Sequence, residues 1–392
     1  MERTYLFYRD SLLVQPQIPR DNLIGLLKDR LGPGRRVILI EGPAQSGKTT
    51  LLAQFTNTYR DQCFSFFLGT TIPNSDAGSF LIDLCEQMGW ALHQKTDNLD
   101  DLDTTELKQV YFGFYRRVAQ KAKASRQPIF FVIDGIEWLP KDHHEQEILS
   151  LLPTEPYPYV FLMGSSVPNR SFAFNYDAWE LPFFSKGETK TYFSGVNLSK
   201  EHILQIHDQG SGMPGYLSII RQHVSAGHYS QDDFNRLPKD LEGLFNLEWQ
   251  RIDTSRRDFL LTLAVIAFSK GQLTERDLQE VVLTFDNADS PLVRTPFLRQ
   301  DRRTQAIQFV SPGYFALGDR FSRFGPRCSI ECKIRNAISD QEHDRVAIAD
   351  ANAIADPDTP QSPLRDREAR RMVPRVRSQI LPFKSQIKEL CH

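Results

Sequence analysis

One short stretch of the chain carries residues suited to holding phosphate. It runs from Gly42 through Pro43, Ala44, Gln45, Ser46, Gly47 and Lys48 to Thr49 and Thr50. The two glycines allow turns that a side chain would block, so peptide N–H groups and the positive end of a following helix can surround phosphate oxygens. The Lys48 ammonium suits the β- and γ-phosphates, and the Thr49 hydroxyl suits Mg²⁺. We therefore predict that these residues bind a nucleoside triphosphate, ATP or GTP, with Mg²⁺.

A second chemical element stands at the end of an apolar run. Residues 129–133 are Ile-Phe-Phe-Val-Ile, and Asp134, Gly135, Ile136 and Glu137 follow them. An apolar strand that ends in Asp is the Walker B arrangement, whose carboxylate holds Mg²⁺ beside the phosphate loop. We predict that Asp134 binds Mg²⁺ together with Thr49. Glu137 is the candidate for orienting or deprotonating the attacking water, and its alternative is a surface carboxylate on the following loop.

Alternating apolar strands and helical stretches must position these groups. We predict strands over residues 37–40, 63–68, 129–133, 159–164 and 179–182, and helices over 21–31, 76–92 and 105–123 and directly after the phosphate loop. This order predicts an α/β fold, with a parallel five-stranded sheet flanked by helices and the ligand at the carboxyl ends of the strands. Ser165 or Ser166, at the tip of the fourth strand, would then lie beside the γ-phosphate and sense its loss.

Two residues before the first strand have two interpretations. Ile18 and Arg20 stand where the chain of such proteins often borders the nucleotide base, so each is a candidate for base contact. The alternative is that they are turn and surface residues.

The chain beyond residue 195 divides into three further segments. Residues 199–225 predict helix, turn and helix, with Ser199 as N-cap and His207 as a packing or surface histidine. Residues 237–322 predict three helices and a terminal hairpin, built from 297–298 and 306–310, which is a winged-helix pattern. Residues after 325 are poor in aromatic residues and rich in Pro, Asp and Arg, which predicts a disordered tail. The predicted domains are 1–195 (the P-loop domain), 196–236 (a helical lid), 237–322 (winged-helix-like) and 323–392 (the tail).

The composition of the chain limits which binding partners and which cellular compartment we expect. The chain has 392 residues and a net charge of −2, which predicts no strong attraction to nucleic acid or to an anionic membrane. Five scattered cysteines do not suggest a disulfide framework. The first residues lack the pattern of a secretory signal, and no run of about 18 apolar residues would cross a bilayer. We expect a cytoplasmic protein with no membrane contact.

Four motifs together resemble those of the STAND class of signalling NTPases, which includes NACHT and NB-ARC proteins and is related to AAA+ ATPases. They are GPAQSGKT at 42–49, FVIDGIEW at 131–138, VFLMGSS at 160–166 and Gly-Met-Pro at 212–214. The resemblance implies ATP and Mg²⁺ as ligands, Pro214 lying against the nucleotide base from the lid, and a place for His207 near the β-phosphate as the alternative to a packing or surface role. No arginine finger is identified in the chain, so hydrolysis is expected to be slow. The resemblance also implies that the nucleotide state controls self-association, and that the chain has a protein partner, which the sequence does not identify. Val167 stands where members often have a sensor arginine, and no fused effector domain is evident.

Two alternatives remain beside this interpretation. A DNA-linked AAA+-like ATPase, resembling origin-recognition proteins, is the first, because four arginines lie near the predicted wing: Arg294, Arg299, Arg302 and Arg303. Asp301 interrupts them, so a solvated hairpin tip is favoured over DNA contact. The second alternative is a nucleotide-binding scaffold that does not hydrolyse ATP.

Overall fold

The computed structural model describes residues 16–250, apart from 69–76, 97, 137–142, 155–156, 169, 226, 228 and 230, together with residues 298–300 and 307–309. The chain divides into two compact units, Met1–Arg251 and Ile252–His392. Almost all described residues belong to the first unit, which contains a sheet domain followed by helices.

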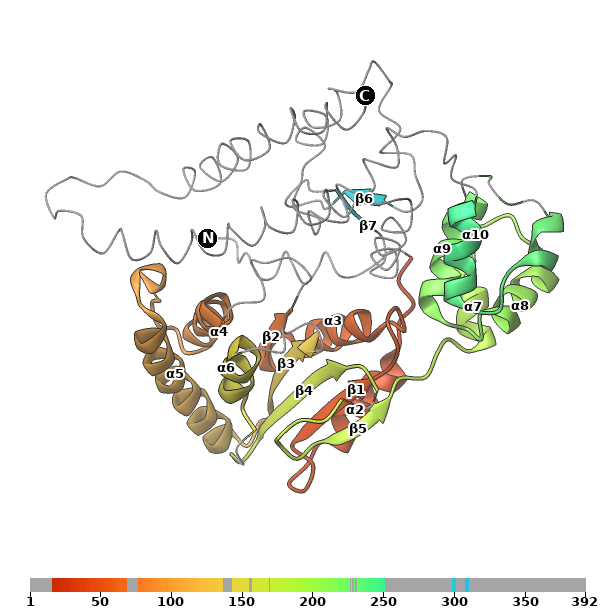
Figure 1. Cartoon of the computed structure of the whole chain (residues 1–392). Helices are drawn as coiled ribbons and strands as arrows, with labels where there is room; N and C mark the ends of the chain where they lie inside the picture. Colours follow the sequence, from red (N-terminus) through yellow and green to blue (C-terminus); the bar gives the residue numbers. More distant parts are fainter. Residues whose placement is uncertain are drawn as a thin grey trace, which may run out of the picture. The chain divides into compact units, whose positions relative to one another are not determined.

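A parallel sheet of five strands forms the centre of the first unit (Figure 1). Its strands are β1 (Val37–Glu41), β2 (Cys63–Phe67), β3 (Ile129–Asp134), β4 (Val160–Ser166) and β5 (Asp177–Glu180). Their order across the sheet is β2-β3-β4-β1-β5, and all neighbouring pairs are parallel. The carboxyl ends of β1, β3 and β4 therefore meet at one edge, and the residues that follow these strands come close together there.

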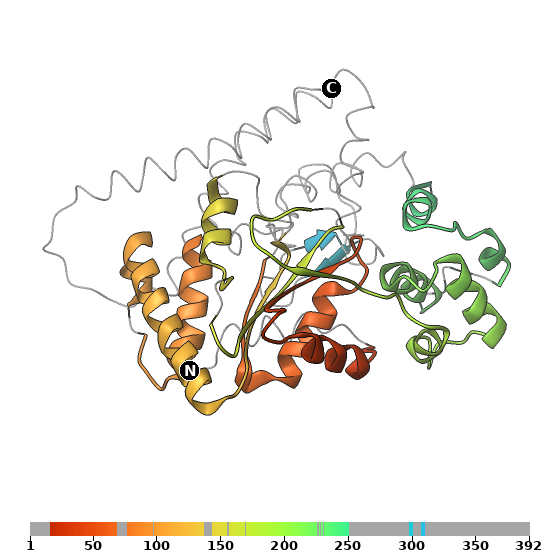
Figure 2. The same ribbon diagram turned by 90° about the horizontal axis from the view of Figure 1, so that it is seen from below.

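Helices cover both faces of the sheet, and Figure 2 shows the sheet between the two layers. One layer holds α4 (Ala77–Ala91), α5 (Thr104–Ser125) and α6 (His143–Leu151), and the other holds α2 (Asp21–Arg30) and α3 (Lys48–Thr58). Side chains of β1 alternate between the layers, because Val37 and Leu39 join the first core and Ile38 and Ile40 the second. This confirms the predicted α/β fold of a P-loop NTPase.

The fifth strand is the least accurate of the predicted strands. It was expected at residues 179–182 but covers Asp177–Glu180. Pro182 has no N–H and cannot donate to a ladder, whereas the Leu181 N–H still donates to the Glu41 carbonyl at 2.9 Å. The connection to the next helix therefore begins at Pro182.

A glutamine from α4 pairs with one peptide on the outer edge of β2. The Gln87 side chain is buried, its Oε1 accepts from the Ser65 N–H at 2.8 Å, and its Nε2 donates to the Ser65 carbonyl at 2.8 Å. The side-chain amide thus pairs with the Ser65 peptide as a sixth strand would, and it satisfies both polar groups of that residue.

Replacing Gln87 with Met should lower the free energy of unfolding of the sheet domain by about 2–4 kcal/mol, because two buried peptide groups lose their partner. Urea denaturation followed by circular dichroism would measure the change. Gln94→Met is the control, since Gln94 is an exposed glutamine just after α4 and should change stability by about 0.5 kcal/mol or less. Equal stability of the two variants would contradict this role of Gln87 at the edge of β2.

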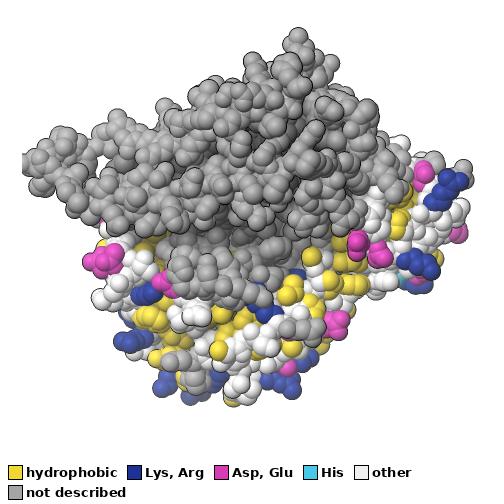
Figure 3. All heavy atoms as spheres, viewed as in Figure 1, with side chains coloured by type: hydrophobic (Ala, Val, Ile, Leu, Met, Phe, Trp, Pro, Cys, Tyr) yellow, Lys and Arg dark blue, Asp and Glu magenta, His cyan; other side chains and the backbone are white. Residues whose placement is uncertain are grey.

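Exposed basic residues occupy the opposite end of the sheet from the strand tips. Arg35 precedes β1, Arg60 precedes β2, and Lys123 and Arg126 precede β3; all four are exposed. Figure 3 shows lysine and arginine side chains gathered along the lower edge of the described surface. The charged loops and the strand tips therefore lie at opposite edges of the sheet.

Four helices follow the sheet domain and form what we call the helical subdomain, residues 186–250. They are α7 (Lys186–Tyr192), α8 (Lys200–Gln209), α9 (Pro214–Ser225) and α10 (Leu241–Gln250). The predicted helix, turn and helix over 199–225 is confirmed by α8 and α9, and the Ser199 side chain caps α8 by accepting from the His202 N–H. His207 is half-buried in the subdomain, with its Nδ1 2.9 Å from the Thr189 Oγ1.

In the second unit, the structure describes only two short strands. Leu298–Gln300 (β6) pairs antiparallel with Ile307–Phe309 (β7), which confirms the predicted hairpin. The other predicted elements of the winged-helix-like module beyond residue 250, and the predicted tail, lie outside the described residues. Within the described part of the chain, no helix is both long and apolar enough to span a membrane.

Candidate nucleotide-binding site

The phosphate loop joins the carboxyl end of β1 to the first turn of α3. Gly47 directly precedes α3, and its φ of 94° lies in the left-handed region that glycine adopts without steric cost. A Cβ atom on Gly42 would lie 2.7 Å from the Ser46 Oγ, so a side chain there would force the Ser46 hydroxyl to move. Gly47 is therefore required by the backbone conformation, and Gly42 by its contact with the Ser46 side chain.

The start of α3 has polar groups available for an anion. The first N–H groups of any helix lack partners within the helix, and no side chain among the described residues caps this end of α3. The Ser46 Oγ is buried and has no hydrogen-bond partner within the described part of the chain. Unsatisfied donors at a helix N-terminus fit phosphate. Pro43 and Ala44 form the exposed crest of the loop, and Thr50 lies in the first turn of α3.

The Lys48 side chain is held over the loop. Only 7% of its surface is exposed, and its Nζ donates to the carbonyls of Gly42 at 2.8 Å and Pro43 at 3.1 Å. These bonds place the ammonium at the loop backbone, where a phosphate bound by the loop would meet it. Its position fits the predicted phosphate contact.

The two predicted metal ligands touch each other. The Thr49 Oγ1 donates to the Asp134 Oδ2 at 2.7 Å across 85 residues of sequence, and Asp134 is 4% exposed. A hydroxyl and a carboxylate oxygen are the hard ligands that Mg²⁺ prefers, with phosphate and water completing its shell. The donor set therefore fits Mg²⁺ bound together with a nucleotide. Glu137, the predicted base, lies outside the described residues.

The two serines at the tip of β4 have different surroundings. The Ser165 Oγ accepts from the Gly135 N–H at 2.7 Å, so this hydroxyl anchors the turn that follows Asp134. The Ser166 Oγ is fully buried and has no hydrogen-bond partner among the described residues. Because β4 lies between β1 and β3, the tip of β4 lies between the strand that leads into the phosphate loop and the strand that ends at Asp134. The sequence alone did not separate their roles.

Pro214 and Gly215, at the start of α9, lie directly against the phosphate loop. A Cβ atom on Gly47 would be 3.6 Å from the Pro214 Cγ, and the Gly215 N–H donates to the Gln45 carbonyl at 3.0 Å. A Cβ atom on Gly215 would lie 2.4 Å from the Gln45 Cβ, so only glycine allows this approach. The motif predicted to face the base thus packs on the loop itself, and the contact with Gln45 was not foreseen.

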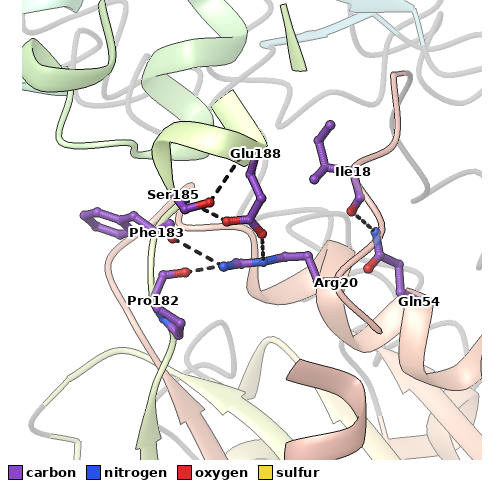
Figure 4. A network of polar contacts seen from close by, with 7 residues as sticks. All are labelled: Ile18, Arg20, Gln54, Pro182, Phe183, Ser185 and Glu188. Carbon is purple, nitrogen blue, oxygen red and sulfur yellow. Dashed lines mark hydrogen bonds and ion pairs between the residues drawn. The ribbon is translucent and has the colours of Figure 1, made fainter. Parts of the chain in front are cut away.

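Ile18 and Arg20 are both buried, which excludes the surface interpretation. The Ile18 carbonyl accepts from the Gln54 Nε2 at 2.9 Å. The Arg20 guanidinium pairs with Glu188 at 3.0 Å (Figure 4). Burial lowers the pKa of Arg20, and the Glu188 carboxylate opposes part of that shift. The side chain of Arg20 is therefore engaged within the protein, and the sequence carried no signal for its partner.

Comparisons with known proteins agree with this geometry. Residues 18–163 match the family described as AAA ATPase domain. The chain resembles a Signal Transduction ATPase with Numerous Domains (STAND) protein with a tetratricopeptide repeat sensor from Pyrococcus horikoshii, with 13% identity and a TM-score of 0.52. That alignment covers 84% of this chain and 46% of the STAND protein, so this chain spans less than half of its length.

Two further solved structures are less similar. They are Cdc6p from Pyrobaculum aerophilum (13% identity, TM-score 0.35, 80% of this chain and 97% of that chain) and the Orc1 protein from Aeropyrum pernix in complex with DNA (10% identity, TM-score 0.35, 78% and 94%). A search of curated protein sequences finds no match. The sheet order and the phosphate loop show the fold of a P-loop NTPase, and residues 18–163 of this domain match the AAA ATPase domain family.

Proposed function

We propose that the chain is an ATP-binding and ATP-hydrolysing regulatory switch of the STAND type, similar to NACHT proteins, whose nucleotide state controls its conformation and self-association. The observation that carries this proposal is the hydrogen bond from the Gly215 N–H to the Gln45 carbonyl. It joins the helical subdomain to the loop that would hold the phosphates. A change in the loop backbone therefore acts directly on the first turn of α9.

The binding step uses groups that already lie together. Loop N–H groups, the first turn of α3 and the Lys48 ammonium would hold the β- and γ-phosphates. Thr49 and Asp134 would hold Mg²⁺, which neutralises charge on the phosphate oxygens when it is bound. Ser165 or Ser166, at the tip of β4, would donate to the γ-phosphate and so distinguish ATP from ADP.

The hydrolytic step is assigned to Glu137. This residue would orient the attacking water in line with the γ-phosphate and accept its proton. The sequence pattern supports this role, because Glu137 follows three residues after Asp134 at the end of an apolar strand. Turnover is expected to be slow unless a neighbouring copy supplies an arginine.

The switch follows from differential contacts. A nucleotide can shift a conformational equilibrium only by binding one state more tightly than the other. ATP and ADP would leave different groups unpaired around Lys48 and the serines at the tip of β4, so the loop and α9 would prefer different arrangements. Light scattering without nucleotide, with ADP and with a non-hydrolysable ATP analogue tests this. A larger assembly with the ATP analogue alone is expected, and one unchanged mass in all three states would refute the switch.

Replacing Glu137 with Gln should preserve ATP binding and reduce phosphate release by about 100-fold or more, because the amide cannot accept the proton from water. Calorimetry and single-turnover phosphate release would measure the two effects. Glu180→Gln is the control, since Glu180 is an exposed carboxylate at the end of β5. Unchanged phosphate release in the Glu137 variant would contradict the assignment. Retention of unhydrolysed ATP by the wild-type chain would favour a scaffold instead.

A further inference from the structure

A buried arginine connects the sheet domain to the helical subdomain. Arg20 is 6% exposed and directly precedes α2. Its Nε donates to the Glu188 Oε1 at 3.0 Å, and its two terminal nitrogens donate to the carbonyls of Pro182 at 2.9 Å and Phe183 at 3.3 Å. Figure 4 shows the guanidinium pointing at these acceptors. We call this set, Arg20 with Pro182, Phe183 and Glu188, the Arg20 clasp.

Both ends of the clasp are fixed by their own elements. On the sheet side, the Arg20 carbonyl accepts from two N–H groups in the first turn of α2, and α2 packs in the core beside α3. On the other side, Glu188 belongs to the capping box of α7: its Oε2 accepts from the Ser185 N–H at 2.7 Å. The ion pair therefore joins two residues whose positions are already set, so little side-chain entropy is lost in forming it.

The connection between β5 and α7 continues the clasp toward the phosphate loop. The Phe184 ring lies 5.4 Å from the Arg20 guanidinium carbon, and the Phe184 N–H donates to the Gly212 carbonyl at 2.9 Å. Gly212 has a φ of 73°, and a Cβ atom there would lie 2.2 Å from the Phe184 carbonyl oxygen. Three residues later, the Gly215 N–H reaches Gln45. A continuous set of contacts thus runs from Arg20 to the phosphate loop.

We propose that Arg20 is a positioning residue that holds the helical subdomain against the phosphate loop, acting through the connection at 182–185 and the start of α9. Removing the Arg20 side chain takes away the three hydrogen bonds that hold the connection at 182–185 and α7 to the start of α2, so this connection is free to open. The inference concerns a contact between two parts of the chain. It therefore holds whether or not the chain hydrolyses ATP.

Hydrogen exchange of the full chain without nucleotide tests the proposal. The Phe184 and Gly215 amides are direct reporters, because their hydrogen bonds are the ones that the clasp supports. In Arg20→Ala we expect both amides to exchange about tenfold faster or more, while amides of β3 keep their wild-type rates. Mass spectrometry with fragmentation that resolves single amides would measure this.

The control is Arg30→Ala. Arg30 also pairs with a carboxylate, Asp177 at 3.0 Å, and joins α2 to β5, but it does not reach the connection at 182–185. It should leave the Phe184 and Gly215 amides unchanged. Equal acceleration in the two variants, or an unchanged Gly215 amide in Arg20→Ala, would overturn the proposal.

A second variant separates the clasp from general instability. Glu188→Gln keeps an amide oxygen for the capping box but removes the charge that faces Arg20. It should accelerate hydrogen exchange of the same two amides and leave exchange of the β3 amides unchanged. In Arg20→Lys, the two amides should exchange more slowly than in Arg20→Ala, because the lysine keeps a positive charge near Glu188. Acceleration of the β3 amides to the same extent as Gly215 would show global unfolding and would refute a positioning role.

Discussion

Replacing Lys48 with Ala should abolish measurable ATP binding, because the affinity for ATP should fall by about 100-fold or more. The Lys48 ammonium is almost fully buried at the loop, where its Nζ lies 2.8 Å from the Gly42 carbonyl. A charge-assisted hydrogen bond to phosphate contributes about 1.5–3 kcal/mol, and Lys48 would make more than one. A loss of about 2.7 kcal/mol corresponds to 100-fold in the dissociation constant. Calorimetry with Mg²⁺ and ATP would measure it.

The matched control for this variant is Lys28→Ala. Lys28 is an exposed lysine on α2, in contact with the Tyr59 ring rather than with the loop. It should bind ATP within about threefold of wild type, since surface substitutions rarely change more than about 0.5 kcal/mol. Circular dichroism would verify that both variants fold. Normal ATP affinity in a folded Lys48 variant would remove the basis of the proposed site.

Elements set by local sequence were predictable. β1, the phosphate loop and α3 follow from an apolar run, two glycines and a helical stripe within 20 residues or so. The contact between Thr49 and Asp134 was also predictable, although 85 residues separate them. The carboxyl ends of parallel strands share one edge, so knowing that both residues follow strands was sufficient.

Contacts that depend on a single distant partner were not predictable. Arg20 and Glu188 are 168 residues apart, and neither lies in a motif that indicates the other. Gln87 gave no sequence signal either, because a glutamine within a helix is ordinarily a surface residue. In both cases burial removes water from a polar group and makes a protein partner obligatory. Which partner it finds depends on how the helices pack, and periodicity alone does not determine that.

Gly215 shows an intermediate case. The sequence predicts a helix, a turn and a helix over residues 199–225 without giving the start of the second helix, and the structure places that start at Pro214. The sequence did not show that the glycine is needed because the Gln45 side chain lies where a Cβ would be. A short motif can therefore locate an element while leaving its neighbour undetermined.

Replacing Asp134 with Asn should remove the dependence of ATP binding on Mg²⁺ and reduce turnover by about 100-fold or more. The side-chain amide oxygen of Asn can still accept from Thr49 Oγ1, as Asp134 does at 2.7 Å, so the strand tip should keep its shape. What is lost is the negative charge, and a neutral amide is a much weaker ligand for Mg²⁺ than a carboxylate. ATP affinity measured with Mg²⁺ and with chelator, together with phosphate release, would separate these effects.

This result must differ from that of the Glu137 variant. Glu137→Gln should keep Mg²⁺-dependent affinity and lose only turnover, whereas Asp134→Asn should lose both, because one residue acts on the water and the other holds the cation. Asp177→Asn is the control: it lies at the amino end of β5 and pairs with Arg30, so affinity and turnover should remain unchanged. Mg²⁺-dependent turnover that survives in Asp134→Asn would mean that the cation is held elsewhere, and the bond between Thr49 and Asp134 would then be structural.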